Sequence, residues 1–366
     1  MAKIIKVLVV DDSSLFRQMI MEHLSAQPDI EVVGYAINAY DAKQKIPVLK
    51  PDVLTLDVEM PGISGIDFLK QLLPTNPIPV VLVSSLNLSV FDALSAGAVD
   101  FVRKPDMSAA NSKKNFFTSL VTKVEAASIA KVRPARQTMG TPHAGGIPAG
   151  NNHGHMQAQT PGTAKPMPFP PLPRTVLDST IIGLGASTGG TEATLAVLQK
   201  LPANIPGIVI TQHMPEGFTA MYAQRLNRIC SMEVREAKNG DVIHPGLALI
   251  APGGKQMEVV RSGRNYIVHC HPGAKVSGHC PSVDVLFNSI AQNVAINKVG
   301  IIMTGMGSDG ADGLLKMRKS GAFTIGQDKD SCVVYGMPMV AYNIGAVCTQ
   351  ASCDNIPSVL LNHLKN

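Results

Sequence analysis

Charged side chains stand at the ends of three short apolar runs in the first third of the chain. They are Asp11 and Asp12 after residues 6–10, Asp57 after residues 53–56, and Lys104 after residues 100–103. Each run has the length of a β-strand, and helix-like sequence separates one run from the next. A parallel sheet would therefore bring these charged side chains together at its carboxyl edge.

Strand-like and helix-like segments alternate five times over this part of the chain. Strands are predicted near residues 5–10, 31–36, 53–57, 80–84 and 100–104. Helices are predicted near residues 14–26, 39–49, 65–73, 89–97 and 111–127. Five such units predict one doubly wound α/β domain with a five-stranded parallel sheet.

The acidic pocket predicted at the sheet edge suits a phosphoryl group. Crowded carboxylates repel one another unless a hard cation lies among them, and Mg²⁺ prefers a few carboxylates together with water and phosphate oxygens. One carboxylate can then attack a phosphoryl donor and become an aspartyl phosphate. Ser84, which ends the apolar run 79–83, would hydrogen-bond the new phosphate, and Lys104 would pair with it. Simple helix capping by strand-end aspartates is the alternative, but it does not explain the whole set.

Three motifs resemble the receiver domain of response regulators. They are Val9-Val10-Asp11-Asp12-Ser13, Leu56-Asp57-Val58-Glu59-Met60-Pro61-Gly62-Ile63-Ser64-Gly65, and Lys104-Pro105, and the resemblance covers residues 4 to about 125. It implies that Asp57 is phosphorylated, that Asp12 and Asp57 bind Mg²⁺ with Asp11 in support, and that Ser84 and Lys104 are the switch and phosphate contacts. Phe101 stands where receivers carry an aromatic that changes rotamer, although an ordinary core phenylalanine is the alternative.

A segment rich in proline and glycine divides the chain. Residues 131–174 hold nine Pro and six Gly, and they contain five basic residues and no acid. This composition predicts a flexible linker, in which His143, His153 and His155 are solvated and not metal ligands. The net charge of +5 comes from this segment, because the rest of the chain has 27 basic and 27 acidic residues. We therefore expect no nucleic-acid partner.

All six cysteines follow this segment, and none forms a C-x-x-C pair. The sequence also shows no signal peptide and no long apolar run. These observations predict a cytoplasmic protein with no direct membrane insertion.

Ser187 lies on a glycine-rich turn in the second half, where an apolar strand near residues 181–186 meets a helix-like segment. A dinucleotide site would need a third glycine where Thr188 stands and an acid after the next strand, at residues 207–212. Both are missing. A nucleophile elbow of the G-x-S-x-G type fits residues 185–189 better. A plain glycine turn with a serine cap is the remaining alternative.

Two further strand ends make Ser187 a candidate nucleophile. His213 directly follows the next apolar strand, and Asp309 lies in the glycine-rich turn after a third strand near residue 301. In a parallel sheet these ends meet, which predicts a nucleophile, a general base and an orienting carboxylate. Asp312 and Asp284 are rivals for the carboxylate, but each is placed to cap or start a helix, so Asp309 is favoured.

A group of histidines and cysteines imitates a zinc site in the same half. It comprises His269, Cys270, His271, His279 and Cys280. Their spacing fits no common zinc pattern. A loop and strand edge near the active site is the more ordinary interpretation, and we expect no cofactor in this half.

Residues 178 to 364 resemble the catalytic domain of the chemotaxis protein-glutamate methylesterases. The matching stretches are residues 185–190, 212–215, 251–254, 281–284 and 304–310. The resemblance implies hydrolysis of glutamate γ-methyl esters and deamidation of certain glutamines on methyl-accepting chemoreceptors. It also implies a Ser187, His213 and Asp309 triad with an oxyanion hole at the Met306 backbone N–H, and a chemotaxis histidine kinase as phosphodonor. Gln256 and Cys280 depart from the His and Arg found in many relatives, and their effect on substrate contacts stays open.

We therefore expect a receiver at residues 1–127, a flexible linker at 128–174 and a methylesterase domain at 175–366. The second domain should be α/β with a mostly parallel sheet that carries the Ser-His-Asp site. A transcriptional regulator is disfavoured, because the second half shows no basic helix-turn-helix. A non-catalytic interaction module in a receptor-like pathway is the alternative. The sequence does not indicate which receptors and glutamates are substrates, which kinase acts, or what the oligomeric state is.

Overall fold

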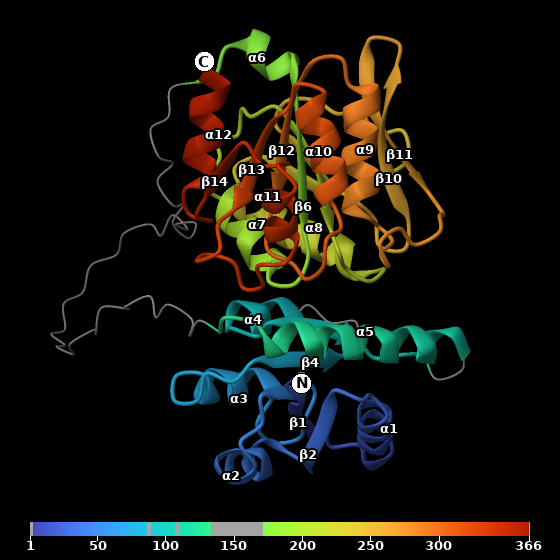
Figure 1. The fold of residues 1–366 in the computed structure, drawn as a ribbon, viewed down its shortest axis with the longest axis vertical. Coiled ribbons are helices and arrows are strands. Elements are labelled where there is room, and N and C mark those ends of the chain that lie inside the picture. Colours follow the sequence, from blue (N-terminus) through green and yellow to red (C-terminus); the bar gives the residue numbers. More distant parts are fainter. Residues whose placement is uncertain (1–2, 86–88, 107–109, 133–170, 366) are drawn as a thin grey trace, which may run out of the picture.

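The computed structural model describes residues 3–85, 89–106, 110–132 and 171–365. They form two α/β domains that lie one above the other, with the carboxyl-terminal domain uppermost in Figure 1. The predicted linker falls largely on residues 133–170, which lie outside the described residues, as do its three histidines.

The first domain alternates strands and helices as the sequence predicts. Its elements are β1 (Ile5–Val10), α1 (Ser14–Ser25), β2 (Ile30–Ala36), α2 (Ala39–Leu49), β3 (Val53–Asp57), α3 (Gly65–Leu72), β4 (Val80–Ser84), α4 (Ser89–Ser95), β5 (Asp100–Arg103) and α5 (Ala110–Ser128). The strands are parallel in the order β2-β1-β3-β4-β5. The predicted fold of the first domain is confirmed.

Alternation along the buried strands gives this sheet two apolar faces. Val7 and Val9 of β1 pack with α1 and α5, whereas Leu8 and Val10 pack with α2 and α3 on the opposite face. Side-chain oxygens of Ser13, Asn38 and Ser64 cap the helices that follow three of the strands. Such caps satisfy backbone donors that the first helical turn leaves unpaired.

The second domain contains a larger sheet. Its elements are α6 (Arg174–Asp178), β6 (Thr180–Ala186), α7 (Gly190–Leu198), β7 (Gly207–Gln212), α8 (Phe218–Ile229), β8 (Glu233–Glu236), β9 (Leu247–Ile250), β10 (Gln256–Ser262), β11 (Asn265–His271), α9 (Val283–Asn293), β12 (Asn297–Ile302), α10 (Ala311–Lys319), β13 (Phe323–Gln327), α11 (Met337–Asn343), β14 (Thr349–Ala351) and α12 (Ile356–Lys365). Within the described residues, none of the helices is long and apolar enough to cross a membrane.

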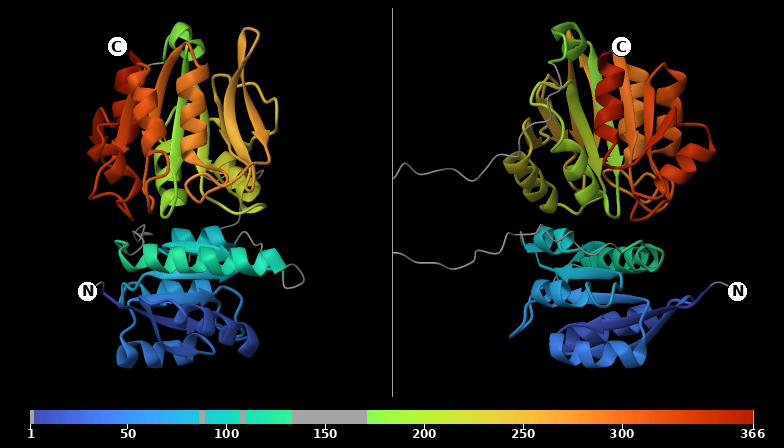
Figure 2. Two further views of the ribbon diagram at one scale, coloured as in Figure 1. Left: turned by 45° about the vertical axis from the view of Figure 1, so that its right-hand side comes forward. Right: turned by 90° about the vertical axis from the view of Figure 1, so that its left-hand side faces the viewer.

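Seven strands of the second domain form one sheet in the order β14-β13-β12-β6-β7-β9-β8, and every pair in it is parallel. Strands β10 and β11 form a separate antiparallel hairpin. The predicted second α/β domain is confirmed. Strands β12, β6 and β7 are neighbours at the centre of the sheet, so the loops that follow them meet at one edge. Figures 1 and 2 show that this edge faces the first domain.

Candidate active site

The turn after β6 presents Ser187 at the start of α7. The Ser187 backbone N–H donates to the Thr304 carbonyl at 2.9 Å, and the Ser187 carbonyl accepts from the Gly190 N–H at 2.7 Å. The Gln212 side-chain amide donates to the same carbonyl at 2.8 Å. Gly189 has φ +75°, a left-handed conformation that favours glycine. These contacts fix the turn through the backbone of Ser187 and do not involve its hydroxyl.

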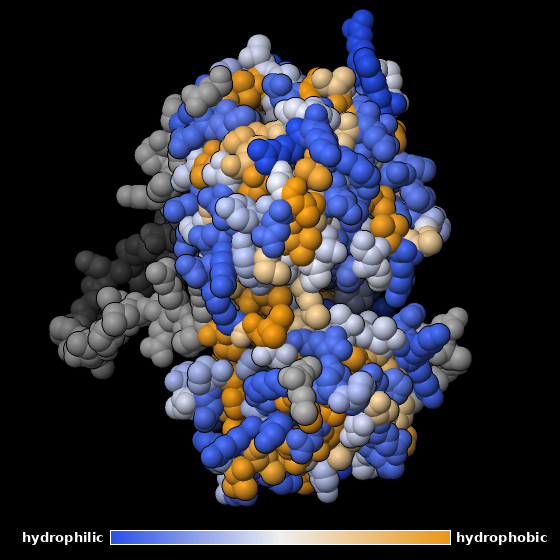
Figure 3. Space-filling view, viewed as in Figure 1, coloured by the Kyte–Doolittle hydropathy of each residue, from blue (hydrophilic) through white to orange (hydrophobic). Residues whose placement is uncertain are grey.

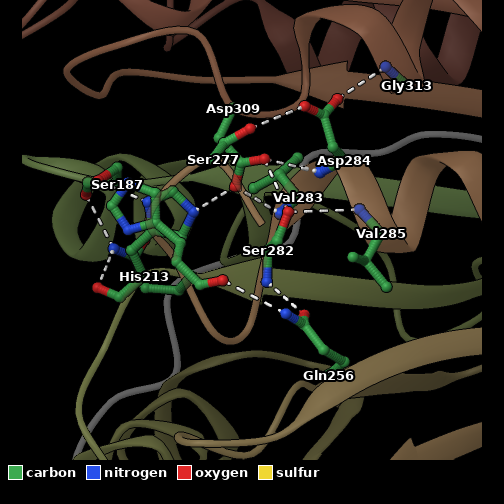
Figure 4. A network of polar contacts seen from close by, with 12 residues as sticks. Ser187, His213, Gln256, Ser277, Ser282, Val283, Asp284, Val285, Asp309 and Gly313 are labelled. Atoms are coloured by element: carbon green, nitrogen blue, oxygen red, sulfur yellow. Dashed lines mark hydrogen bonds and ion pairs between the residues drawn. The ribbon is translucent and has the colours of Figure 1, made fainter. Parts of the chain in front are cut away.

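The structure brings Ser187, His213 and Asp309 into one line of contacts (Figure 4). The His213 Nδ1 atom lies 3.0 Å from Ser187 Oγ, and the His213 Nε2 atom lies 2.7 Å from Asp309 Oδ2. The side chains of His213 and Asp309 are only 7% and 1% exposed. Because β12, β6 and β7 are adjacent, three loops far apart in sequence supply these groups. The arrangement suits proton transfer from a serine hydroxyl to an imidazole.

Asp309 is surrounded by hydrogen-bond donors. The Ser282 hydroxyl donates to Oδ1 at 2.8 Å, and the backbone N–H groups of Val283 and Asp284 donate to the carboxylate at 2.7 and 3.0 Å. Burial raises the pKa of Asp309, but the hydrogen bond and charge of His213, together with these donors, outweigh it. The pKa therefore lies below its ordinary value, and the carboxylate stays ionised.

The two rival carboxylates occupy different positions. Asp284 is buried, and its Oδ1 accepts a hydrogen bond from the Gly313 N–H at 2.7 Å (Figure 4). Burial raises the pKa of Asp284, and the nearby Asp309 carboxylate raises it further. Asp312 is exposed in the first turn of α10. Neither side chain contacts His213 in the described part of the chain.

The loop after β12 passes close to the candidate nucleophile. A Cβ atom added at Gly305 would lie 2.6 Å from Ser187 Cβ, so only glycine fits there. The Gly305 N–H donates to the Val334 carbonyl at 3.0 Å. The next N–H, that of Met306, has no hydrogen-bond partner among the described residues. This free donor therefore lies one residue from the closest approach to Ser187.

Three further residues support this site in ways that the sequence analysis did not predict. Ser282 holds Asp309, Gln256 accepts from the Ser282 N–H at 2.8 Å, and the His279 ring stacks on the His213 ring. Gln256 is buried and also donates to the Ala274 and His279 carbonyls, so its side chain fixes the backbone of the loop at residues 274–282. The sequence signal was present in the Pro281-Ser282-Val283-Asp284 stretch, but it did not show which side chain faces Asp309.

The acidic residues of the first domain also meet as predicted. Carboxylate oxygens of Asp11, Asp12 and Asp57 lie within 4.8 Å of one another. The Lys104 Nζ atom lies 2.6 Å from Asp57 Oδ2 and 3.6 Å from Asp11 Oδ2. The Ser84 hydroxyl is buried beside them and has no hydrogen-bond partner in the described residues.

The positive charge and hydrogen-bond donors in this pocket do not offset the negative charge of its carboxylates. Burial raises the pKa of Asp11 to about 6, against the opposing charge of Lys104 and with further help from Asp57. Burial also raises the pKa of Asp57, although the Lys104 hydrogen bond lowers it. Clustered hard oxygens with raised pKa values fit a divalent cation such as Mg²⁺. Asp11, Asp12 and Asp57 are the residues that would hold it.

The two domains contact each other beside Ser187. The Thr188 hydroxyl donates to Asp100 Oδ2 of β5 at 2.6 Å, and both side chains are buried. The other oxygen of Asp100 pairs with Lys123 of α5. A buried hydrogen bond to a charged group contributes about 1.5–3 kcal/mol. The first domain is therefore attached directly to the turn that carries the candidate nucleophile.

Aromatic side chains extend this contact. Phe101, next to Asp100, packs on Phe218 with ring centroids 4.6 Å apart, and Phe91 stacks on Tyr222 at 5.7 Å. Arg225 donates to the Ser95 hydroxyl at 2.7 Å. Phe101 is thus buried against the second domain as well as within its own core. Figure 3 shows hydrophobic residues on both sides of the seam between the two lobes.

The contact between the two domains is not continuous. A cleft of about 480 Å³ lies between the domains, lined by residues of β5 and α5 and by Pro215 and Glu216. Lys104 lines the same cleft, and its Nζ atom contacts Asp57. Lys104 therefore links the acidic pocket to the space between the domains.

Comparisons with known proteins cover both domains. A family model for CheB methylesterase matches residues 182–360, and one for the response regulator receiver domain matches residues 7–111. The chain is 49% identical to protein-glutamate methylesterase/protein-glutamine glutaminase 2 of Syntrophomonas wolfei subsp. wolfei, over 97% of this chain and 96% of that protein. It is 42% identical to a protein-glutamate methylesterase/protein-glutamine glutaminase of Salmonella typhi, over 98% of this chain and 96% of that protein. The chain therefore belongs to the protein-glutamate methylesterase/protein-glutamine glutaminase family and carries a receiver domain ahead of its CheB methylesterase domain.

Proposed function

We propose that this protein is a phosphorylation-activated hydrolase that removes methyl groups from glutamate γ-methyl esters, and deamidates particular glutamines, on the signalling helices of chemoreceptors. The relatives that match nearly the whole chain carry the names of these two activities. The line of contacts from Ser187 through His213 to Asp309 is the observation that carries the proposal.

The geometry gives each side chain of the triad a role. The Ser187 oxygen attacks the ester carbonyl, and its proton passes to His213 Nδ1. The tetrahedral intermediate then expels methoxide, which takes the proton from His213 and leaves as methanol. A water molecule attacks the acyl-serine in the same way and releases the glutamate carboxylate and Ser187. With a glutamine amide, ammonia leaves in place of methanol.

Charge that develops on the carbonyl oxygen needs donors that are already in place. The Met306 N–H follows Gly305, which approaches Ser187 closely, and it has no hydrogen-bond partner among the described residues, so it would serve as one donor of the oxyanion hole. Asp309 accepts from the His213 Nε2–H, which keeps Nδ1 unprotonated toward the serine and stabilises the imidazolium as it forms.

In the receiver, Asp57 is the proposed phosphoryl acceptor, and a chemotaxis histidine kinase is the proposed donor. Bound Mg²⁺ would offset the negative charge of the carboxylates and of the incoming phosphoryl oxygens. Lys104 already contacts Asp57 and would pair with the phosphate, while the free Ser84 hydroxyl would donate to it. Phe101, which follows Asp100 on β5, would change its packing in response.

The domain contact explains how phosphorylation would act. With Asp100 bonded to Thr188 and Phe101 packed on Phe218, the receiver lies next to Ser187 and would restrict the approach of a receptor helix. Phosphorylation of Asp57 weakens this contact and opens the site. Coupling energies of about 1–3 kcal/mol are typical of such switches. We place the domains at residues 1–127 and 175–366 with a linker at 128–174, since α5 ends at Ser128 and α6 begins at Arg174, each within one residue of these bounds.

The described cysteines are free, which fits a cytoplasmic setting.

Release of methanol from methylated chemoreceptor membranes tests the activity. The full-length chain should release methanol slowly alone and faster with acetyl phosphate and Mg²⁺, whereas the Ser187→Ala variant should release none above background. A wild-type chain that binds receptor membranes but releases no methanol would support the non-catalytic interaction module. That alternative is not favoured, because the three side chains already lie in contact.

A further inference from the structure

His279 lies flat against the candidate general base. The centroids of the His279 and His213 rings are 3.6 Å apart, and the ring planes differ by 10°. This close parallel contact joins the 276–282 loop to the catalytic histidine. The mechanism described above gives His279 no role.

The backbone holds His279 in this position from two sides. It forms an antiparallel bridge with Val276, in which each N–H donates to the other residue's carbonyl at 2.9–3.0 Å. The Gln256 side-chain amide donates to the His279 carbonyl at 3.3 Å, and Gln256 is itself buried. The backbone that carries the stacked ring is therefore fixed by hydrogen bonds. Three residues later, Ser282 of the same loop donates its hydroxyl to Asp309.

The triad contacts act only in the plane of the His213 ring. The Nδ1 and Nε2 atoms face Ser187 and Asp309, and the ring is joined to the backbone through its Cβ–Cγ bond. None of these contacts packs against a face of the ring. The His279 ring does, so it resists tilting of the imidazole out of this plane.

The charge of His279 suits this role. Burial lowers the pKa of His279 to about 4, and the charges of His213, Lys123 and Lys275 act in the same direction, while Asp309 opposes them. His279 is therefore neutral near pH 7. A neutral aromatic face next to a forming imidazolium is favourable, whereas a second positive charge there would be repulsive.

We propose that His279 is a positioning residue for the esterase reaction: its flat, neutral ring holds the His213 imidazole in the plane that faces Ser187. This inference rests on the proposed function, since it concerns the same histidine and the same reaction. It assigns the requirement to the ring's shape and not to its nitrogens. A flat apolar ring should therefore replace His279, whereas an aliphatic side chain should not.

The test compares wild type with H279F and H279L in the full-length chain, activated by acetyl phosphate and Mg²⁺. Methanol release is measured over a range of methylated receptor membranes, and the rate of Ser187 labelling by diisopropyl fluorophosphate is measured in parallel. H279F should stay within about threefold of wild type, whereas H279L should lose about 10- to 100-fold in kcat with KM nearly unchanged. The labelling rate of H279L should fall by the same factor, because the probe needs activated Ser187 but no receptor contact.

Each contrary outcome overturns the inference. Wild-type rates for H279L would show that the stack is not needed, and an H279F as slow as H279L would show that the ring nitrogens matter. An H279L with normal labelling but raised KM would make His279 a receptor contact. The unfolding temperatures of the three proteins show whether a slow variant is also a destabilised one. If H279L is destabilised, the rate of H279F still tests whether a flat apolar ring can replace His279. Failure of wild type itself to release methanol would instead be a failure of the proposed function.

Discussion

The two domains place carboxylates at the carboxyl ends of parallel strands in opposite electrostatic settings. In the receiver, Asp11 and Asp57 are buried together with too few donors, and their pKa values are raised. In the methylesterase domain, Asp309 is equally buried, but His213, Ser282 and two backbone N–H groups surround it and its pKa is lowered. Burial is thus common to both sites, and the hydrogen-bond donors and positive charges around each carboxylate decide the direction of its pKa shift.

The difference shows how one sheet geometry serves two kinds of chemistry. A carboxylate cluster short of donors gains stability from each positive group that arrives, so it suits a site that binds Mg²⁺ and accepts a phosphoryl group. A carboxylate saturated with donors is already fixed, so it suits a site that must orient a histidine before substrate arrives. The predictions below challenge this contrast, beginning with the largest expected effect.

Ser187→Ala should abolish the esterase activity of the methylesterase domain and leave the receiver unchanged. Loss of a nucleophile that acts with its base lowers kcat by roughly 10⁴- to 10⁶-fold. Methanol release measures this effect, and phosphorylation by acetyl phosphate is the control that should not change. Retention of more than about a tenth of wild-type turnover would remove Ser187 from this role.

Asp309→Asn tests the carboxylate that is surrounded by hydrogen-bond donors. The amide favours the wrong tautomer of His213, so kcat should drop by about 10³- to 10⁴-fold. Asp284→Asn and the exposed Asp312→Asn are matched controls, and both should cost far less. The assignment of Asp309 would be refuted by an Asp284→Asn variant that is the slowest of the three.

Asp57→Asn tests the carboxylate cluster that is short of donors. The variant should take up no phosphoryl group from labelled acetyl phosphate, and stimulation of the esterase, about 5- to 150-fold for typical coupling, should vanish. Its basal methanol release should match that of the unphosphorylated wild type. Labelling that persists in this variant would place the acceptor elsewhere.

Asp100→Ala tests the contact that connects the two sites. It removes the acceptor for the Thr188 hydroxyl without altering the methylesterase domain, so basal methanol release should rise toward the rate of the phosphorylated wild type, a gain of roughly 5- to 150-fold at most for typical coupling. Phosphorylation at Asp57 should proceed as in wild type, which serves as the internal control. An unchanged basal rate would argue against occlusion by the receiver but would leave the triad and Asp57 assignments intact.

Mg²⁺ should stabilise the receiver in a pH-dependent way. A raised folded-state pKa means that ionised Asp11 destabilises the fold above about pH 6, and this penalty disappears as the pH falls toward 3.8, where the unfolded group also binds its proton. At pH 7.5, 10 mM Mg²⁺ should therefore raise the unfolding temperature by roughly 3–6 °C, and at pH 4.5 the shift should be small. Differential scanning calorimetry measures both shifts.

The Asp11→Asn variant is the matched control for this prediction. It should be more stable than wild type without Mg²⁺ at pH 7.5, and it should gain less from added Mg²⁺. An equal Mg²⁺ shift in the two proteins would contradict the assignment of Asp11 to the cation site.

Local patterns in the sequence were sufficient for most of the architecture. Five alternating units predicted the receiver strands and helices to within a few residues, because each buried parallel strand is a continuous apolar run and polar residues mark its ends. The same logic placed Ser187, His213 and Asp309 at strand ends. It could not order the strands, so it predicted a shared edge and not the adjacency of β12, β6 and β7.

The tertiary structure decided everything that depends on orientation and on contact between distant segments. It turned Nδ1 of His213 toward Ser187 and Nε2 toward Asp309, and it placed His279 on the face of the ring. It also joined Asp100 to Thr188 across two domains. A sequence specifies residue types and their local spacing, and therefore strands, helices and the polar groups at their ends. Which of those groups touch, and with what charge, follows only from packing, because burial and donor count belong to the folded neighbourhood and not to the residue.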